Sequence, residues 1–111
     1  MLPKSRRLNL KKSFKWAVTG TRVETPSFKI YVKKGDNLFP KVGIALTRSQ
    51  FKKAHERVEA KRLSFKASES IYQSLSNDLN LVIMPKAIIL KKTALELIKE
   101  LEDVKTRFNT D

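Results

Sequence analysis

One short segment limits the possible folds of this chain more than any other. Residues 80–84 read Asn-Leu-Val-Ile-Met and are followed by Pro85. A continuous apolar run of this kind is typical of a central strand covered on both faces. Pro85 ends the strand because proline cannot donate a hydrogen bond to a sheet ladder. The fold therefore needs a sheet with other structure packed on both sides of this strand.

The segments before this strand predict a helix and further strands. Residues 27–33 alternate between apolar and polar side chains, the pattern of a half-buried strand. Turn-forming residues follow at 34–37, and residues 39–47 resemble a second strand, so we predict an antiparallel hairpin. Residues 10–19 carry apolar side chains at helical spacing and predict a short helix that ends near Gly20.

Two longer helices complete the predicted fold. The helix at about 52–76 has a buried stripe made of Ala60, Leu63, Ala67, Ile71 and Leu75. A capping box, Thr93-Ala94-Leu95-Glu96, starts a last helix that runs to about Phe108. Residues 21–24 could form one more short strand. This order predicts a single α+β domain over residues 1–111, with helices against a mainly antiparallel sheet and a basic arm at residues 1–9.

The distribution of charge suggests a polyanionic partner. The chain has 24 Lys and Arg residues against 11 Asp and Glu, a formal net charge of +13. Residues 1–66 carry +14 of this, and residues 67–111 carry −1. Because so much like charge destabilises a compact monomer, a bound polyanion would relieve the repulsion. Nucleic acid is the leading candidate, and an anionic membrane surface is the second.

The residue inventory offers no catalytic or metal site. His55 is the only histidine, and it has no evident partner that would make it a general base. Cysteine is absent, which excludes thiolate chemistry and fits a reducing cytoplasm. We find no metal-binding spacing, no glycine-rich phosphate loop and no paired carboxylates. No signal peptide, membrane anchor or membrane-spanning run is expected.

The basic residues are better organised than the acidic ones. Lys53, Arg57 and Lys61 are spaced four residues apart, so they form one stripe along the long helix. Arg62 and Lys66 form a second stripe, and both stripes can lie along a phosphate backbone. A merely solvated helix face is the simpler alternative, but Glu56 and Glu59 neutralise too few of these cations.

An aromatic residue between cations suggests a second RNA-binding surface. Tyr31 lies between Lys29 and Lys33 on the polar side of its strand. Phosphates can bind such amines while a base of a single strand stacks on the ring. The alternative is a tyrosine that only covers the sheet. Phe14 is expected to be mostly packed, and Trp16 more exposed.

Nearly the whole chain resembles the bacterial ribonuclease P protein component. The start, Leu2-Pro3-Lys4-Ser5-Arg6-Arg7-Leu8, is similar to that family's Leu-Pro-Lys-x-x-Arg-Leu. Residues 42–48, Val-Gly-Ile-Ala-Leu-Thr-Arg, resemble its Leu-Gly-Ile-Ser-Val-Ser-Lys, and residues 81–86 resemble its last strand. The family signature Arg-Asn-Arg-x-Lys-Arg reads Arg57-Val58-Glu59-Ala60-Lys61-Arg62 here, so two of its five defined residues differ and Glu59 reverses a charge.

The resemblance implies a fold and a function. The fold is a small two-layer sandwich of order α-β-β-β-α-β-α, similar to domain 2 of ribosomal protein S5. The protein binds a catalytic RNA and the single-stranded 5′ leader of precursor tRNA, and the RNA, with Mg²⁺, removes the leader. The implied partners are ribonuclease P RNA and precursor tRNA in the cytoplasm, without a membrane, an obligate protein partner or a cofactor bound by the protein itself.

Matching positions suggest roles for individual residues. With the departures from the signature taken into account, the residues expected to contact the catalytic RNA are Arg48, Lys52, Lys53, Arg57, Lys61, Arg62 and Lys66. Those expected at the leader are Phe14, Lys15, Val18, Lys29, Tyr31 and Lys33, of which Lys15, Lys29 and Lys33 come from the charge pattern alone. The alternative functions are a ribosomal or other structural RNA-binding protein, a membrane-surface protein, and a nuclease that acts alone.

Overall fold

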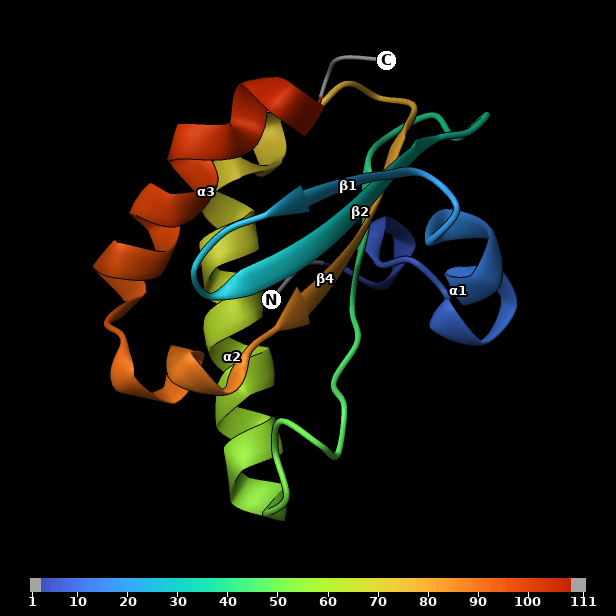
Figure 1. Ribbon diagram of the computed structural model, residues 1–111. Coiled ribbons are helices and arrows are strands. Elements are labelled where there is room, and N and C mark those ends of the chain that lie inside the picture. The colour runs from blue at the N-terminus through green and yellow to red at the C-terminus, as the bar shows by residue number, and fades with distance from the viewer. Residues whose placement is uncertain (1–2, 109–111) are drawn as a thin grey trace.

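The computed structural model describes residues 3–108, which form three α-helices and a four-stranded sheet (Figure 1). The helices are α1 (Leu10–Ala17), α2 (Ala54–Ile71) and α3 (Ala94–Phe108). The strands are β1 (Thr21–Glu24), β2 (Phe28–Lys34), β3 (Lys41–Ile44) and β4 (Leu79–Pro85). Short 3₁₀ turns lie at η1 (Lys4–Arg6), η2 (Tyr72–Ser74) and η3 (Ala87–Lys91). The predicted order of elements is confirmed. Residues 21–24 do form a strand, β1, so three strands precede α2.

The sheet has the order β1-β2-β4-β3, which corrects one prediction. The hairpin expected between residues 27–33 and 39–47 is wrong, because β4 lies between β2 and β3. β2 pairs with β1 and β4 in antiparallel fashion, whereas β3 pairs with β4 in parallel. The apolar β4 takes one of the two inner places, and both of its faces are covered, since Leu81 and Ile83 belong to one core cluster and Val82 to another. The sheet is mainly antiparallel, as expected.

The main core lies between the sheet and the layer formed by α2 and α3, which cover the same face (Figure 1). The helix predicted at about 52–76 ends earlier, at Ile71, but all five residues of its predicted stripe are buried, Leu75 just after η2: Ala60, Leu63, Ala67, Ile71 and Leu75. The capping box of α3 is also confirmed. The Glu96 backbone N–H donates to Thr93 Oγ1 at 3.2 Å, and the Thr93 backbone N–H donates to Glu96 Oε1 at 3.1 Å.

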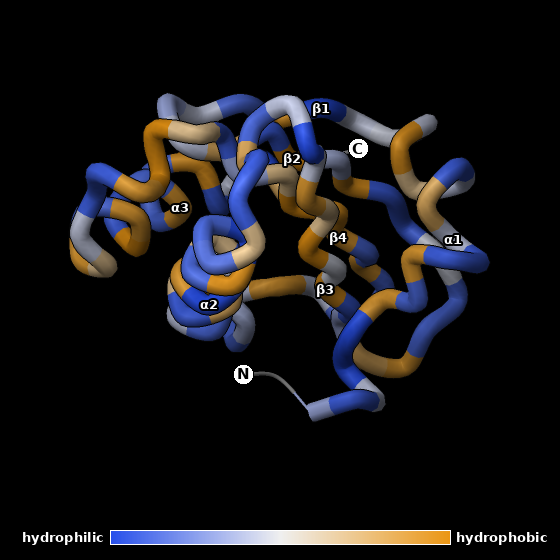
Figure 2. The backbone as a smooth tube through the Cα atoms, turned by 90° about the horizontal axis from the view of Figure 1, so that it is seen from below, coloured by the Kyte–Doolittle hydropathy of each residue, from blue (hydrophilic) through white to orange (hydrophobic). Residues whose placement is uncertain are grey.

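A smaller apolar cluster holds α1 on the opposite face of the sheet (Figure 2). Leu8, Ala17 and Val82 are its buried members. Gly43 on β3 allows this close packing, because a Cβ there would lie 2.8 Å from Leu10 Cδ2. The predicted basic arm contributes as well. Its backbone forms a bridge between Arg7 and Val42, whereas residues 1–2 lie outside the described part of the chain.

Gly20 connects α1 to β1, but not as the left-handed helix cap that its position suggests. Its φ angle is not positive, and a Cβ at this position would lie 2.2 Å from the carbonyl oxygen of Val32. The requirement for glycine is therefore close backbone approach. We expect Gly20→Ala to lower the free energy of unfolding by about 1–3 kcal/mol, because a backbone segment must move. Urea denaturation tests this, and an unchanged midpoint would contradict the packing.

Candidate nucleic-acid interface

The start of α2 presents the first group of predicted RNA-binding residues. Lys52 and Lys53 precede the helix, and they are exposed together with Lys61, Arg62 and Lys66. The helix turns its buried stripe to the core and leaves these cations at the surface, although Lys61 points toward the edge strand β3 and not away from the sheet as the pattern predicted. Arg48 is exposed in the loop that leads to the helix. Six of the seven residues predicted to contact the catalytic RNA are thus available on the surface.

Arg57, the seventh residue, has a structural role that the sequence did not indicate. It is half-buried, and its Nη1 donates to the carbonyl oxygens of Phe51 at 2.9 Å and Lys52 at 3.1 Å. Phe51 is completely buried, so these bonds hold the loop before α2 against the core. Replacing Arg57 would therefore loosen the loop before α2 as well as remove a charge. A loss of RNA binding in such a variant would not by itself show that Arg57 contacts RNA.

Glu59 occupies the signature position where the resemblance places an arginine, and it binds Arg62. The Arg62 guanidinium donates to the Glu59 carboxylate at 2.5 and 3.1 Å. These hydrogen bonds hold the pKa of Glu59 below its usual value, so the carboxylate stays charged near neutral pH. Val58, at the other altered position, is 68% exposed. Glu59 thus lowers the positive charge of the helix, and Val58 adds an exposed apolar side chain to it.

This pairing makes a testable prediction about RNA affinity. Glu59→Gln removes a negative charge and releases Arg62, so RNA binding should become about three- to tenfold tighter, with a salt dependence steeper by one to two phosphate contacts. Filter binding across a range of salt concentrations measures both quantities. Glu102→Gln on α3 is the control, because that carboxylate also pairs with a nearby cation, Lys105. Equal gains in both variants would contradict a specific effect at α2.

The second predicted surface lies between α1 and the sheet. Phe14 and Tyr31 pack against the same small cluster, and each is half-buried, so part of each ring lies at the surface. Val18, the C-cap residue of α1, is half-buried as well. The structure therefore brings together a helix and a strand that are separated by β1 in the sequence, and it leaves aromatic edges between them.

The cations predicted for this surface lie on α1 and β2, and the described cation–ring contact there involves Trp16 and not Phe14 or Tyr31. Lys33 Nζ donates to Thr19 Oγ1 at 2.6 Å and lies 5.4 Å from the centre of the Trp16 ring. Trp16 is 40% exposed, as expected, and its pairing with a cation on the neighbouring strand is a feature that the sequence pattern did not reveal. Lys29 is half-buried, and Lys15 is exposed on α1 without a described contact to the aromatic pair.

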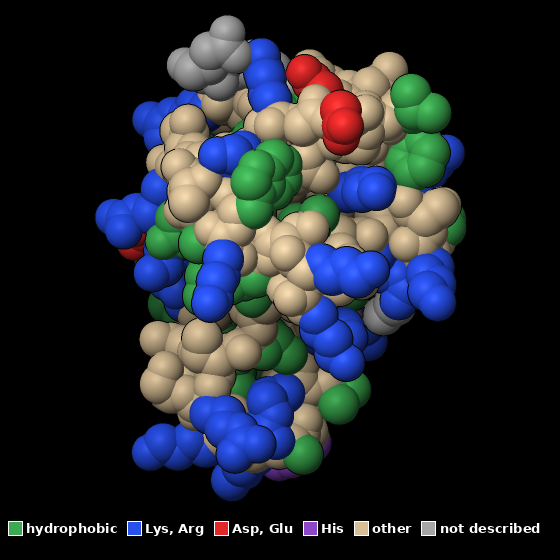
Figure 3. Space-filling view, turned by 90° about the vertical axis from the view of Figure 1, so that its right-hand side faces the viewer, with side chains coloured by type: hydrophobic (Ala, Val, Ile, Leu, Met, Phe, Trp, Pro, Cys, Tyr) green, Lys and Arg blue, Asp and Glu red, His purple; other side chains and the backbone are tan. Residues whose placement is uncertain are grey.

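Figure 3 shows the side of the molecule that carries α1. Lys and Arg side chains are spread over this side, hydrophobic side chains lie between them, and acidic side chains are few. Within residues 3–108, no three His, Cys, Asp or Glu residues gather as metal ligands would. None of the helices in that range is both long and apolar enough to span a bilayer. These features define the class: a small basic α+β protein whose exposed cations and aromatic edges suit RNA.

Comparison with known proteins identifies the family. The family model described as Ribonuclease P matches residues 2–109, so the chain belongs to that family. The RNase P protein from Thermotoga maritima superimposes with a TM-score of 0.81 at 17% identity, covering 94% of this chain and 98% of that one. An RNase P protein from Staphylococcus aureus gives a TM-score of 0.76 at 18% identity, with 96% and 97% covered. No curated protein matches the sequence.

The match confirms the resemblance and the predicted fold. At these identities the solved structures establish the fold, while the family model carries the functional class. The chain is therefore a protein subunit of the ribonuclease P type, which acts in tRNA 5′ processing within an endoribonuclease complex and associates with ribonuclease P RNA. The individual contact residues remain predictions.

Proposed function

We propose that this protein binds the catalytic RNA of ribonuclease P through the start of α2 and binds the 5′ leader of precursor tRNA between α1 and the sheet. In this proposal the RNA cleaves the phosphodiester and holds the Mg²⁺ ions, and the complex works in the cytoplasm. The protein residues contribute binding and orientation.

The arrangement of charge is the observation that supports this proposal most. Two RNA molecules must approach each other during cleavage, and each is a polyanion. A protein with +14 on residues 1–66 lowers the repulsion between them. Its exposed α2 cations and its aromatic α1 surface lie on different elements, so one protein can contact both RNAs.

The α1 surface explains how precursor could be preferred over product. The leader is absent from mature tRNA, so contacts with it stabilise only the precursor complex. A base can stack on the accessible part of the Phe14 or Tyr31 ring face while Lys29 approaches a phosphate. Stacking tolerates any base, which suits leaders of differing sequence.

The decisive experiment is cleavage of a leader-bearing precursor tRNA by the catalytic RNA of the same organism at low millimolar Mg²⁺. We expect the protein to restore cleavage at the mature 5′ end. RNA binding without any stimulation of cleavage would refute the proposal and favour a structural RNA-binding protein.

The leader contact has its own test. Tyr31→Ala should weaken binding of precursor tRNA by about five- to tenfold, because one stacking contact is lost. Binding of mature tRNA should not change. Competition assays with both substrates measure the difference, and an equal loss for both would place Tyr31 outside the leader contact.

A further inference from the structure

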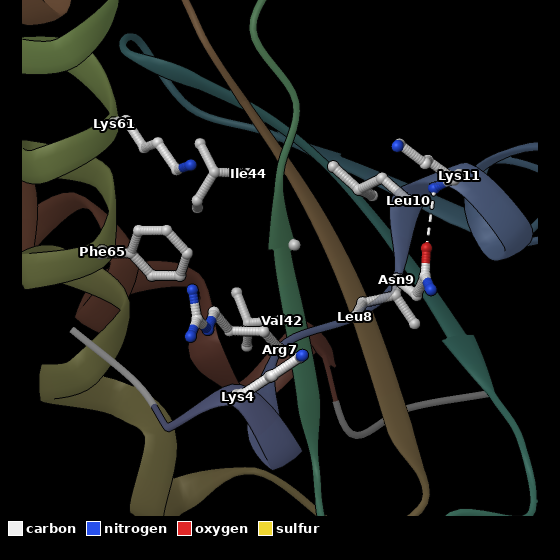
Figure 4. Close-up of a pocket in the computed structure, with 11 residues that line it drawn as sticks. Lys4, Arg7, Leu8, Asn9, Leu10, Lys11, Val42, Ile44, Lys61 and Phe65 are labelled. Atoms are coloured by element: carbon white, nitrogen blue, oxygen red, sulfur yellow. Dashed lines mark hydrogen bonds between the residues drawn. The ribbon is translucent and has the colours of Figure 1, made fainter.

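A wide groove lies between the two proposed RNA surfaces, and of its lining residues only Lys61 belongs to either of them. Its volume is about 640 Å³, within the roughly 300–1,000 Å³ of small-molecule sites. Three parts of the chain form it: the segment from Lys4 to Lys11, the edge strand β3, and the middle of α2 (Figure 4). These segments are far apart in the sequence, so no local motif could reveal the groove.

The walls of the groove carry positive charge. Its lining includes four exposed cations and no acidic residue: Lys4, Arg7, Lys11 and Lys61. They come from both sides, since Lys61 extends from α2 toward Ile44 while Lys4 and Arg7 lie on the arm (Figure 4). Lys11 stands on α1 at the far side. An anion in the groove would therefore be surrounded by cations.

The floor of the groove is apolar. Leu8, Val42, Ile44 and Phe65 are buried, and Leu10 is half-buried. The Phe65 ring points from α2 toward β3, and the Arg7 guanidinium lies beside it (Figure 4). A purely phosphate-binding surface needs no such floor. Apolar side chains beneath a ring of cations suit a ligand with a flat apolar part and an anionic part.

We propose that this groove binds one unpaired nucleotide of RNA, with its base against the apolar floor and its phosphate among the four cations. Nucleotides that leave the base stack are held by proteins in this way, through apolar contacts with the base. The position of the groove supports the assignment, because Lys61 belongs to the α2 surface and Lys11 to α1. The proposed function places one RNA on each surface, so a nucleotide of either RNA that extends past its surface reaches the groove, and to this extent the inference rests on the proposed function.

The test uses the full-length protein and free adenosine 5′-monophosphate, with inorganic phosphate as the comparison at equal ionic strength. We expect the nucleotide to shift the backbone amide NMR signals of Gly43, Ile44 and Phe65 and to bind at least about fivefold more tightly than phosphate. Equal affinity for the two ligands, or shifts confined to the outer face of α2, would overturn the proposal.

Matched variants test the role of the walls. Lys4→Ala combined with Lys11→Ala should weaken nucleotide binding about fivefold or more, since two cations of the groove are lost. Lys91→Ala combined with Lys99→Ala removes the same charge from the C-terminal part of the chain and should leave the affinity unchanged. Equal losses in both double variants would show a general charge effect and refute the site. No catalytic RNA is needed, so this inference and the proposed function can fail independently.

Discussion

Replacing Lys53, Lys61 and Lys66 together with alanine is expected to weaken binding of ribonuclease P RNA by roughly 10- to 1,000-fold near physiological salt. Each of these side chains is exposed on or next to α2, where it can reach a phosphate. For each phosphate contact that is lost, RNA binding releases fewer counterions. The magnitude of the slope of log K against log salt should therefore fall by about three. The fold should survive, because none of the three residues belongs to the core.

Filter binding or fluorescence anisotropy over a range of salt concentrations measures the affinity and the slope together. The matched control replaces Lys91, Lys99 and Lys105 with alanine, which removes the same charge from the C-terminal part of the chain. We expect this control to lose little affinity. If both triple variants lose the same amount, the binding energy comes from net charge and α2 is not the interface.

Much of the fold could be predicted because local patterns specify it. The alternation around Tyr31 predicted β2, the apolar run before Pro85 predicted β4, and the capping box at Thr93 gave the start of α3. In each case the pattern depends on neighbouring residues, so it is visible in the sequence. Burial of the α2 stripe followed from its spacing for the same reason.

The pairing of strands could not be predicted in this way. Residues 39–47 follow β2 after a turn, and this nearness suggested a hairpin. The six residues between Lys34 and Lys41 are enough to separate the strands. The inner position beside β2 then goes to β4, whose Leu81 and Ile83 are buried on one face and Val82 on the other. The strand order depends on packing between distant segments, which a single local pattern does not contain.

The candidate site was predictable as a set of charges but not as a set of contacts. Spacing and the family resemblance both placed Arg57 among the RNA-binding cations, whereas its hydrogen bonds to Phe51 and Lys52 give it a role in the loop structure. Glu59 was recognised as a reversed charge, but only the structure pairs it with Arg62. Partners of long flexible side chains are decided by geometry, and this limits what sequence patterns can predict.

Glu100 on α3 holds the β1–β2 turn, and its replacement should lower stability more than the Gly20→Ala substitution does. Its carboxylate accepts hydrogen bonds from Thr25 Oγ1 at 2.8 Å, from the Ser27 backbone N–H at 2.9 Å and from Ser27 Oγ at 2.7 Å. Lys92 Nζ adds an ion pair at 3.1 Å, and the Glu100 side chain is only 11% exposed. Glu100→Gln should lower the free energy of unfolding at neutral pH by about 2–4 kcal/mol, since a charged acceptor of several buried donors is lost.

The pH dependence separates this role from simple packing. Burial raises the pKa of Glu100, but the hydrogen bonds from Ser27 and Thr25 and the ion pair with Lys92 outweigh it and hold the pKa below the usual 4.5. A carboxylate with a lowered pKa stabilises the fold above its unfolded-state pKa, and this contribution is lost as the pH falls through the folded-state value. The difference in the free energy of unfolding between wild type and Glu100→Gln should therefore be full at pH 7 and shrink below about pH 4.5.

Urea denaturation from pH 7 to pH 3 measures this difference. Glu102→Gln is a more exposed control that should change stability by less than about 1 kcal/mol. A difference that stays constant down to pH 3 would mean that shape, not charge, makes Glu100 important for holding the turn against α3.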